Sequence, residues 1–209
     1  TGVGKSETAK ALAQAFYGRR DAILTLNGGD YATPESSIKA QRFIAAQMTV
    51  NKRQVILLDE IEKSHKSVMD MYMRMIDEGI VVDKYGNQRS LNSTVIIATS
   101  NLGADIFSDL SEVMHLNQQA NPNKLDPRLE EAWWRRESSV RKALQNGDAG
   151  LNNGIKPEFL ERFSLFVPFL PLARKTMAMI ARMQLEKFKQ NMTHARYGID
   201  IMLPKKMSH

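Results

Sequence analysis

Val-Ile-Leu-Leu-Asp-Glu, at residues 55–60, is the stretch that decides the fold. Its four apolar residues follow one another without a polar break, which is typical of a strand buried on both faces of a parallel sheet. Residues 94–98 (Thr-Val-Ile-Ile-Ala) show a similar pattern, and residues 22–26 and 165–169 are two further predicted strands. Stretches with helical periodicity separate most of these strands. The alternation predicts an α/β fold, with a mostly parallel sheet flanked by helices.

Five stretches have the apolar spacing of helices. They are residues 7–17, 34–50, 68–76, 128–144 and 172–191, and Gly18 is expected to end the first of them. The residues predicted to form the apolar faces of the first two helices are Ala11, Leu12, Ala15, Phe16, Ile38, Phe43, Ile44 and Met48. Residues 117–126 and 146–154 are predicted loops, and a further strand is expected at residues 197–203.

A glycine-rich stretch leads directly into the first predicted helix. Residues 1–6 match the last six positions of the phosphate-loop pattern G-x-x-x-x-G-K-[ST]. Glycines let backbone N–H groups wrap around phosphates, and the N-terminus of the helix adds the positive end of its dipole. Lys5 would contact the β- and γ-phosphates, and the Ser6 hydroxyl would bind Mg²⁺. The predicted nucleotide-binding residues are Thr1, Gly2, Val3, Gly4, Lys5, Ser6 and Glu7. The alternative is a plain turn before a helix.

Polar side chains follow two of the buried strands. Asp59 and Glu60 end the strand at residues 55–58, and Asn101 follows the strand at residues 94–98. Asp59 would hold Mg²⁺ or its water ligands, Glu60 would act as the general base toward water, and Asn101 would contact the γ-phosphate or that water. A solvated acidic turn is the alternative for the carboxylates, and a turn residue for Asn101. Together with the phosphate loop, these residues predict a site for ATP and Mg²⁺.

Composition excludes several classes of protein. The 209 residues contain no Cys, so disulfide scaffolds and thiolate metal sites are excluded, and a reducing, cytoplasmic location is expected. The net charge of +6 lies within residues 156–209, while residues 1–155 are balanced, which disfavours a nucleic-acid partner. No apolar run approaches the ~18 residues of a membrane span, so none is expected.

Three longer runs carry a family resemblance. VILLDEIEKSH at residues 55–65, the run from Asp77 to Asp105 that contains TSNLG, and KPEFLERF at residues 156–163 resemble the second ATPase module of Clp-type heat-shock unfoldases. These proteins are a branch of the AAA+ superfamily, and the resemblance covers residues 1–192. It implies an AAA+ P-loop NTPase core that hydrolyses ATP in a homo-oligomeric ring, a hexamer, and acts on protein substrates or partners.

The resemblance also implies roles for single residues. Lys5 and Ser6 belong to Walker A, Asp59 and Glu60 to Walker B, and Asn101 to sensor 1. Arg162, after Pro-Glu-Phe at residues 157–159, matches the arginine finger that completes the site of a neighbouring subunit. The alternative for Arg162 is a surface ion pair with Glu158, four residues earlier.

The resemblance implies two subdomains, and the sequence also differs from the family pattern in some places. Residues 1–170 would form the large ATPase subdomain, with an insertion at about residues 117–153, and residues 171–209 the beginning of a small helical lid. The strand before the phosphate loop and sensor 2 are expected outside this sequence. The family's Gly-aromatic-Val-Gly pore loop does not occur between Tyr31 and Val55 in this sequence; either the protein lacks it or this sequence does not include it. Tyr31 and Tyr85 are the remaining candidates for axial aromatic residues. Trp133 and Trp134 are expected in a core or an interface.

Alternatives to an unfoldase remain open. One is a Clp-like AAA+ ATPase that does not thread polypeptide and powers or assembles a larger machine, such as a secretion apparatus. Another is a non-hydrolysing, nucleotide-gated assembly module, which the presence of Glu60, Asn101 and Arg162 disfavours. A nucleic-acid loader or helicase is the last, disfavoured by the neutral first 155 residues.

Overall fold

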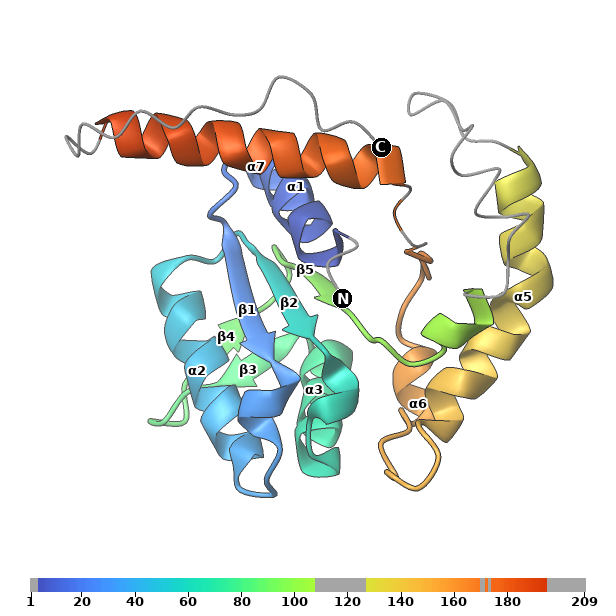
Figure 1. The fold of residues 1–209 in the computed structure, drawn as a ribbon. Coiled ribbons are helices and arrows are strands. Elements are labelled where there is room, and N and C mark those ends of the chain that lie inside the picture. Colours follow the sequence, from blue (N-terminus) through green and yellow to red (C-terminus); the bar gives the residue numbers. More distant parts are fainter. Residues whose placement is uncertain (1–3, 108–126, 170–171, 173, 195–209) are drawn as a thin grey trace.

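A three-stranded parallel sheet forms the centre of the molecule in the computed structural model, which describes residues 4–107, 127–169, 172 and 174–194 (Figure 1). The strand order is β1 (Ile23–Asn27), β2 (Val55–Asp59) and β5 (Val95–Ala98). Leu24 lies opposite Ile56, which lies opposite Ile96, so the three strands are in register and their carboxyl ends meet at one edge. The predicted strands at residues 22–26, 55–58 and 94–98 are therefore confirmed, and so is the parallel sheet.

Helices cover both faces of this sheet. The side chains of a strand alternate between its faces, and this alternation divides the apolar residues into two clusters. On one face, Val55 and its neighbours pack against α1 (Lys5–Tyr17). On the other, Ile56 and Leu58 pack with α2 (Ser36–Val50) and α3 (Lys66–Glu78). Because β2 has helices on both faces, all four of its apolar side chains are buried, as its unbroken apolar run predicts.

The predicted faces of α1 and α2 are partly wrong. Helix α1 buries Ala9 and Ala13, and the ring of Phe16 is 55% exposed. Helix α2 buries Ile44 and Met48 as expected, but Ile38 is 57% exposed. Small residues face the sheet on α1 because the helix packs close to β2, and large side chains would hold it away. Gly18 ends α1 as predicted, with a left-handed φ of 74° that glycine adopts without steric cost.

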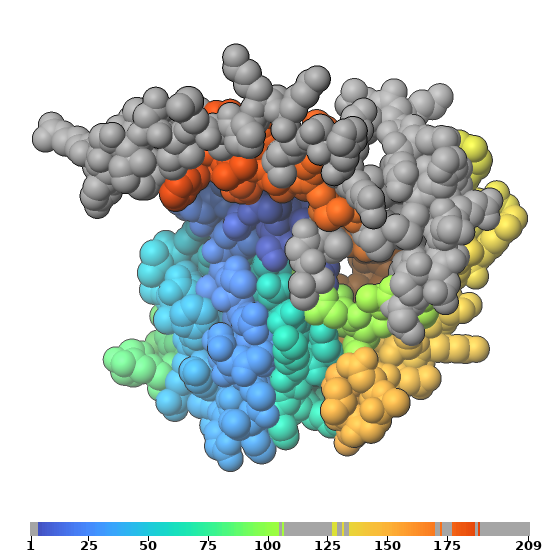
Figure 2. All heavy atoms as spheres, viewed as in Figure 1, coloured from blue at the N-terminus to red at the C-terminus, as the bar shows by residue number. Residues whose placement is uncertain are grey.

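Part of the second half of the chain packs beside this core. It contains η3 (Ala104–Phe107), α5 (Pro127–Asn146), α6 (Pro157–Leu160) and α7 (Arg174–His194). Val140 and Leu144 of α5 and Phe159 of α6 join the cluster that contains α2 and α3. The space-filling view shows η3, α5 and α6 lying against the body formed by the sheet and its helices (Figure 2). Among the residues that the structure describes, no helix combines the length and apolar character that a membrane span requires.

The predicted strand at residues 165–169 is wrong. These residues adopt no regular secondary structure, and the side chains of Leu165 and Val167 are 75% and 60% exposed. A strand is held by ladder hydrogen bonds to a neighbour, and no strand of the described residues pairs with this stretch. An apolar run without a partner does not form a strand. The predicted loop at residues 117–126 and strand at residues 197–203 lie outside the described residues.

A candidate nucleotide-hydrolysis site

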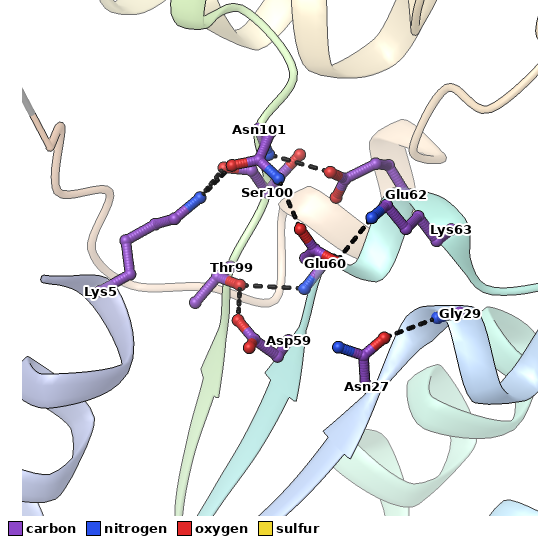
Figure 3. Close-up of polar contacts among 10 residues, drawn as sticks. All are labelled: Lys5, Asn27, Gly29, Asp59, Glu60, Glu62, Lys63, Thr99, Ser100 and Asn101. Carbon is purple, nitrogen blue, oxygen red and sulfur yellow. Dashed lines mark hydrogen bonds and ion pairs between the residues drawn. The ribbon is translucent and has the colours of Figure 1, made fainter. Parts of the chain in front are cut away.

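The carboxyl edge of the sheet brings together polar residues that lie far apart in the sequence. Asp59 is the last residue of β2 and Glu60 follows it, Asn101 follows β5, and Lys5 is the first residue of α1. Carboxyl ends of adjacent parallel strands lie at the same edge, so local patterns at residues 59–60 and 99–101 converge in space. The close-up shows Lys5, Asn101 and Glu60 directed toward one another (Figure 3).

Asn101 connects Lys5 to Glu60. The Lys5 Nζ donates to Asn101 Oδ1 at 2.6 Å and to the carbonyl oxygen of Ser100 at 2.9 Å. Asn101 Nδ2 in turn donates to Glu60 Oε1 at 3.0 Å. An ammonium group, an amide and a carboxylate thus form one hydrogen-bonded chain. Such a set can bind a phosphate at one end and a water molecule at the other.

Glu60 is held in an unusual backbone conformation. Its φ of 52° lies in the left-handed region, which non-glycine residues adopt rarely and mostly where neighbouring structure imposes it. The Glu60 N–H donates to Thr99 Oγ1 at 3.0 Å, and the carboxylate accepts from Lys63 Nζ at 2.7 Å. The Lys63 ammonium lowers the pKa of the Glu60 carboxyl, partial burial acts in the opposite direction, and Asn101 lowers the pKa further. Glu60 is therefore a carboxylate at neutral pH, the form that a general base requires.

Gly28 makes this conformation of Glu60 possible. Gly28 opens the short helix η1 (Gly28–Tyr31) after β1, and a Cβ atom at this position would overlap the carbonyl oxygen of Glu60. Backbone atoms cannot move away as the end of a flexible side chain can, so any larger residue here would displace the Glu60 turn.

Asp59 is oriented by Thr99. The Thr99 hydroxyl donates to Asp59 Oδ1 at 2.5 Å, and its side chain is buried between the two strand ends. Hydrogen bonds of this kind orient carboxylates that bind metal ions. Among the described residues, no three His, Cys, Asp or Glu side chains gather into a metal-binding group. This donor set fits Mg²⁺, which is commonly held by one or two protein oxygens together with phosphate and water.

The phosphate loop is described only in part. Thr1, Gly2 and Val3 lie outside the described residues. Gly4 precedes α1 with a φ of 101°, and no side chain caps the helix there, which leaves its first N–H groups available for phosphate. Ser6 lies in the same first turn, next to Lys5. The Glu7 carboxylate forms ion pairs with Lys10 and Arg20.

Arg162 lies outside this group of residues. Its Nε and Nη2 donate to the two carboxylate oxygens of Asp77 on α3, at 2.7 and 2.5 Å, and its Nη1 donates to the carbonyl oxygen of Glu158. The guanidinium lowers the pKa of the Asp77 carboxyl. The alternative expected from the sequence, an ion pair with the Glu158 carboxylate, is replaced by a bidentate pair with a residue 85 positions away. The hydrogen bonds of Arg162 within the described residues thus join it to Asp77 and Glu158, and none of them reaches Lys5, Asp59, Glu60 or Asn101.

Three residues of the site were not predicted from the sequence: Thr99, Glu62 and Lys63. Each contacts a predicted residue: the contacts of Thr99 and Glu62 depend on how the turns after β2 and β5 face one another, and Lys63 contacts Glu60 within the same turn. In the sequence, the only indication of these three residues was that polar residues are frequent around the predicted site. Thr99 ends an apolar strand, and Glu62 and Lys63 follow the Asp59-Glu60 pair within four residues.

Comparisons with known proteins identify the family of the chain. A family model described as "AAA domain (Cdc48 subfamily)" matches residues 1–166. The chaperone protein ClpB3 of Arabidopsis thaliana chloroplasts is 28% identical over 213 residues, which cover 96% of this chain and 20% of that protein. The chaperone protein ClpB of Aquifex aeolicus is 28% identical over 216 residues, covering 96% of this chain and 20% of that protein.

Solved structures show the same fold. The S. cerevisiae Hsp104–ADP complex superimposes with a TM-score of 0.63 and 23% identity, over 92% of this chain and 31% of that chain. This chain spans about a fifth of the length of the two ClpB relatives. Since the family model matches most of the sequence, the protein belongs to the AAA domain family, and the chain is an AAA+ module of the Clp type.

Proposed function

We propose that this chain is the ATP-hydrolysing module of a Clp-type ring, a hexamer, that remodels protein substrates. The observation that carries the proposal is the chain of hydrogen bonds from Lys5 through Asn101 to Glu60. In this chain, the Asn101 amide lies between the Lys5 ammonium, which can bind phosphate, and the Glu60 carboxylate, which can accept a proton from water. The relatives are chaperones by name, which supports a protein substrate and a cytoplasmic or organellar location, and the balanced charge of residues 1–155 continues to disfavour nucleic acid.

Each residue of the site has a distinct role in this proposal. Lys5 leaves Asn101 and Ser100 and neutralises the β- and γ-phosphates of ATP. Ser6 and Asp59 hold Mg²⁺, which supplies positive charge to the phosphates when bound. Glu60 accepts the proton of the attacking water, and Asn101 aligns that water with the γ-phosphate. The Thr99 hydroxyl keeps Asp59 and Glu60 in their relative positions, since it contacts both.

Hydrolysis explains this site better than nucleotide-gated assembly alone. A module that only binds nucleotide needs Lys5 and a metal ligand, but it does not need a strained, ionised Glu60. Strained backbone is kept where function requires it. The left-handed Glu60, its bond to Asn101 and the glycine that accommodates it together support catalysis.

Assembly into a ring is part of the proposal. Arg162 makes no hydrogen bond to the site of its own chain among the described residues and would complete the site of a neighbour, where a guanidinium stabilises charge on the transferring phosphoryl group. In the same proposal, residues 1–170 form the large ATPase subdomain, and α7 belongs to the beginning of a small helical lid.

Replacing Lys5 by alanine tests the phosphate site. We expect the affinity for ATP to fall about 10-fold or more, because hydrogen bonds to charged groups contribute roughly 1.5–3 kcal/mol. Titration calorimetry of the full-length protein with a slowly hydrolysed ATP analogue measures this change. Lys52→Ala, which removes an exposed lysine elsewhere, is the matched control and should bind normally. Native affinity in Lys5→Ala would show that the phosphates bind elsewhere.

Threading of polypeptide depends on an exposed aromatic residue, and one of the two candidates is buried. Tyr31 is 6% exposed within the core, so the expectation that it could face a ring axis is wrong. Tyr85 is 75% exposed, at the tip of the hairpin formed by β3 (Ile80–Val82) and β4 (Gln88–Ser90). The Asp83 carboxylate stiffens this tip by accepting from Tyr85, Asn87 and Arg89. Partial burial raises the pKa of Asp83, but these bonds outweigh it and lower the pKa to about 2.

Replacing Tyr85 by alanine separates a threading motor from one that does not thread. We expect basal ATPase activity to stay native and unfolding of a tagged, folded substrate to be lost, because an aromatic ring grips varied sequences through a large apolar contact. Fluorescence of the substrate, measured with the full-length protein, follows the unfolding. Tyr85→Phe keeps the ring and should unfold the substrate normally. Unchanged unfolding in Tyr85→Ala would favour the non-threading ATPase that powers a larger machine.

A further inference from the structure

Glu62 is a buried carboxylate beside the proposed site. It belongs to η2 (Ile61–Lys63), the short helix that follows Glu60, and its side chain is 6% exposed. Glu62 Oε1 accepts from the backbone N–H of Asn101 at 3.0 Å, across 39 positions of sequence. Glu62 Oε2 is buried and has no hydrogen-bond partner among the described residues. Figure 3 shows the Glu62 carboxylate directed at the Asn101 backbone, on the side away from Lys5.

The burial of the Glu62 carboxylate destabilises the folded state, so we expect it to serve a function. Burying a carboxylate is unfavourable, and a buried oxygen without a donor adds a further penalty. The adjacent cation, Lys63, is paired with Glu60, so it does not satisfy Glu62 Oε2. An apolar residue of similar size would fill the same space more cheaply if packing were the only requirement. The bond to Asn101 is therefore the feature that justifies the carboxylate.

The bond fixes the residue that links the two ends of the site. Asn101 lies in an irregular segment after β5, where ladder hydrogen bonds no longer hold the backbone. Glu62 supplies a substitute anchor on the Asn101 N–H, while the Asn101 side chain spans Lys5 and Glu60. Glu60 and Glu62 belong to the same turn. The carboxylate that holds Asn101 and the proposed base are therefore parts of one short segment. A misplacement of about 1 Å in such a site can cost 10²-fold in rate.

We propose that Glu62 is a positioning residue for ATP hydrolysis, which holds the backbone of Asn101 so that its side chain aligns water between Lys5 and Glu60. This inference rests on the function proposed for the same site. Glu62 acts through Asn101 and contacts neither nucleotide nor metal. In this role, Glu62 provides a hydrogen-bond acceptor at a fixed position for the Asn101 N–H, and its negative charge is not needed.

Two substitutions separate the acceptor from the charge. Glu62→Gln keeps an acceptor oxygen and removes the charge, and Glu62→Met keeps the length and leaves only a thioether, a much weaker acceptor. In the full-length protein we expect Glu62→Gln to retain kcat within about 3-fold. We expect Glu62→Met to lose about 10- to 100-fold in kcat, with the affinity for ATP unchanged, because the misplaced group acts on the chemical step. If Glu62→Met fails to fold, which thermal melting detects, Glu62→Leu takes its place.

A double substitution distinguishes positioning from a general structural role. In an Asn101→Ala background, Glu62→Met should lower kcat by no more than about 2-fold further, because the side chain that Glu62 positions is already absent. A full additional loss in that background would overturn the proposal. So would native kcat in both Glu62→Met and Glu62→Leu.

Amide hydrogen exchange gives a readout that does not depend on hydrolysis. The Asn101 N–H should exchange about 10-fold faster or more in Glu62→Met than in the native protein or in Glu62→Gln, because its acceptor oxygen is missing. Equal exchange in all three would overturn the proposal. A native protein without ATPase activity would instead overturn the proposed function, and the exchange rates would still decide whether Glu62 holds Asn101.

Discussion

Replacing Glu60 by glutamine should leave ATP bound and lower its turnover by ~10²-fold or more, the loss typical of a missing general base. Glutamine has nearly the same shape as glutamate, and its carbonyl oxygen can still accept from Asn101 or Lys63. The geometry of the turn is therefore retained and the basicity is lost. Release of phosphate under saturating ATP measures turnover, and binding of labelled ATP measures affinity.

The control for this prediction is a carboxylate outside the site. Glu35 is exposed before α2, and Glu35→Gln makes the same chemical change without touching the hydrogen-bonded chain. It should hydrolyse ATP at the native rate. If Glu60→Gln also did so, Glu60 would not be the base, and another acceptor for the proton of water would have to be sought.

Replacing Arg162 by alanine should abolish hydrolysis that depends on the ring, with a loss of ~10³-fold or more, as is typical when an arginine finger is removed. The affinity of each subunit for nucleotide should change little, because Arg162 lies outside the site of its own chain. ATPase activity is measured at protein concentrations at which rings form, and nucleotide binding is measured on the same sample.

The ion pair of Arg162 requires its own control. Arg162 is held by Asp77, so Arg162→Ala also breaks a bidentate pair between α3 and the segment after α6. Asp77→Asn weakens the same pair and leaves the guanidinium in place. If loss of the pair were the cause, Asp77→Asn would abolish activity to the same extent. We expect it to retain most of the activity.

Mixed rings test whether Arg162 acts across a subunit boundary. Subunits with Arg162→Ala still carry a sound Glu60, and subunits with Glu60→Gln still carry a sound Arg162. Mixing the two inactive variants should restore part of the activity, because some interfaces then combine both residues. Mixed rings of verified composition that show no recovery would contradict action in trans.

Local patterns were sufficient to identify the central strands and the main chemical groups. The run at residues 55–58 is apolar throughout because β2 has helices on both faces, so burial left a direct mark on the sequence. Gly18 and Asn101 were also recognisable, since a helix end and the end of an apolar strand have local signatures. The convergence of Asp59, Glu60 and Asn101 follows from the rule that adjacent parallel strands end at one edge.

Tertiary packing determined which side chains are buried and which apolar stretches form strands, and apolar periodicity did not predict these correctly. Helix α1 turns Ala9 and Ala13 toward the sheet and leaves Phe16 exposed, because close approach to β2 favours small residues. Residues 165–169 have the composition of a strand, but no neighbour among the described residues pairs with them. Tyr31 and Tyr85 were both candidates for axial residues from the sequence, and the tertiary structure shows that Tyr31 is buried and Tyr85 is exposed.

The sequence was sufficient for the three strands of the central sheet and for the residue types at its edge, because these depend on neighbours within a few positions. The tertiary structure alone decided which side chains meet there. Thr99 bridges Asp59 and Glu60, Glu62 holds the Asn101 N–H, and Arg162 pairs with Asp77. Such contacts join residues 39 to 85 positions apart. They form only when packing has set the distance and direction between separate turns, which no local pattern records.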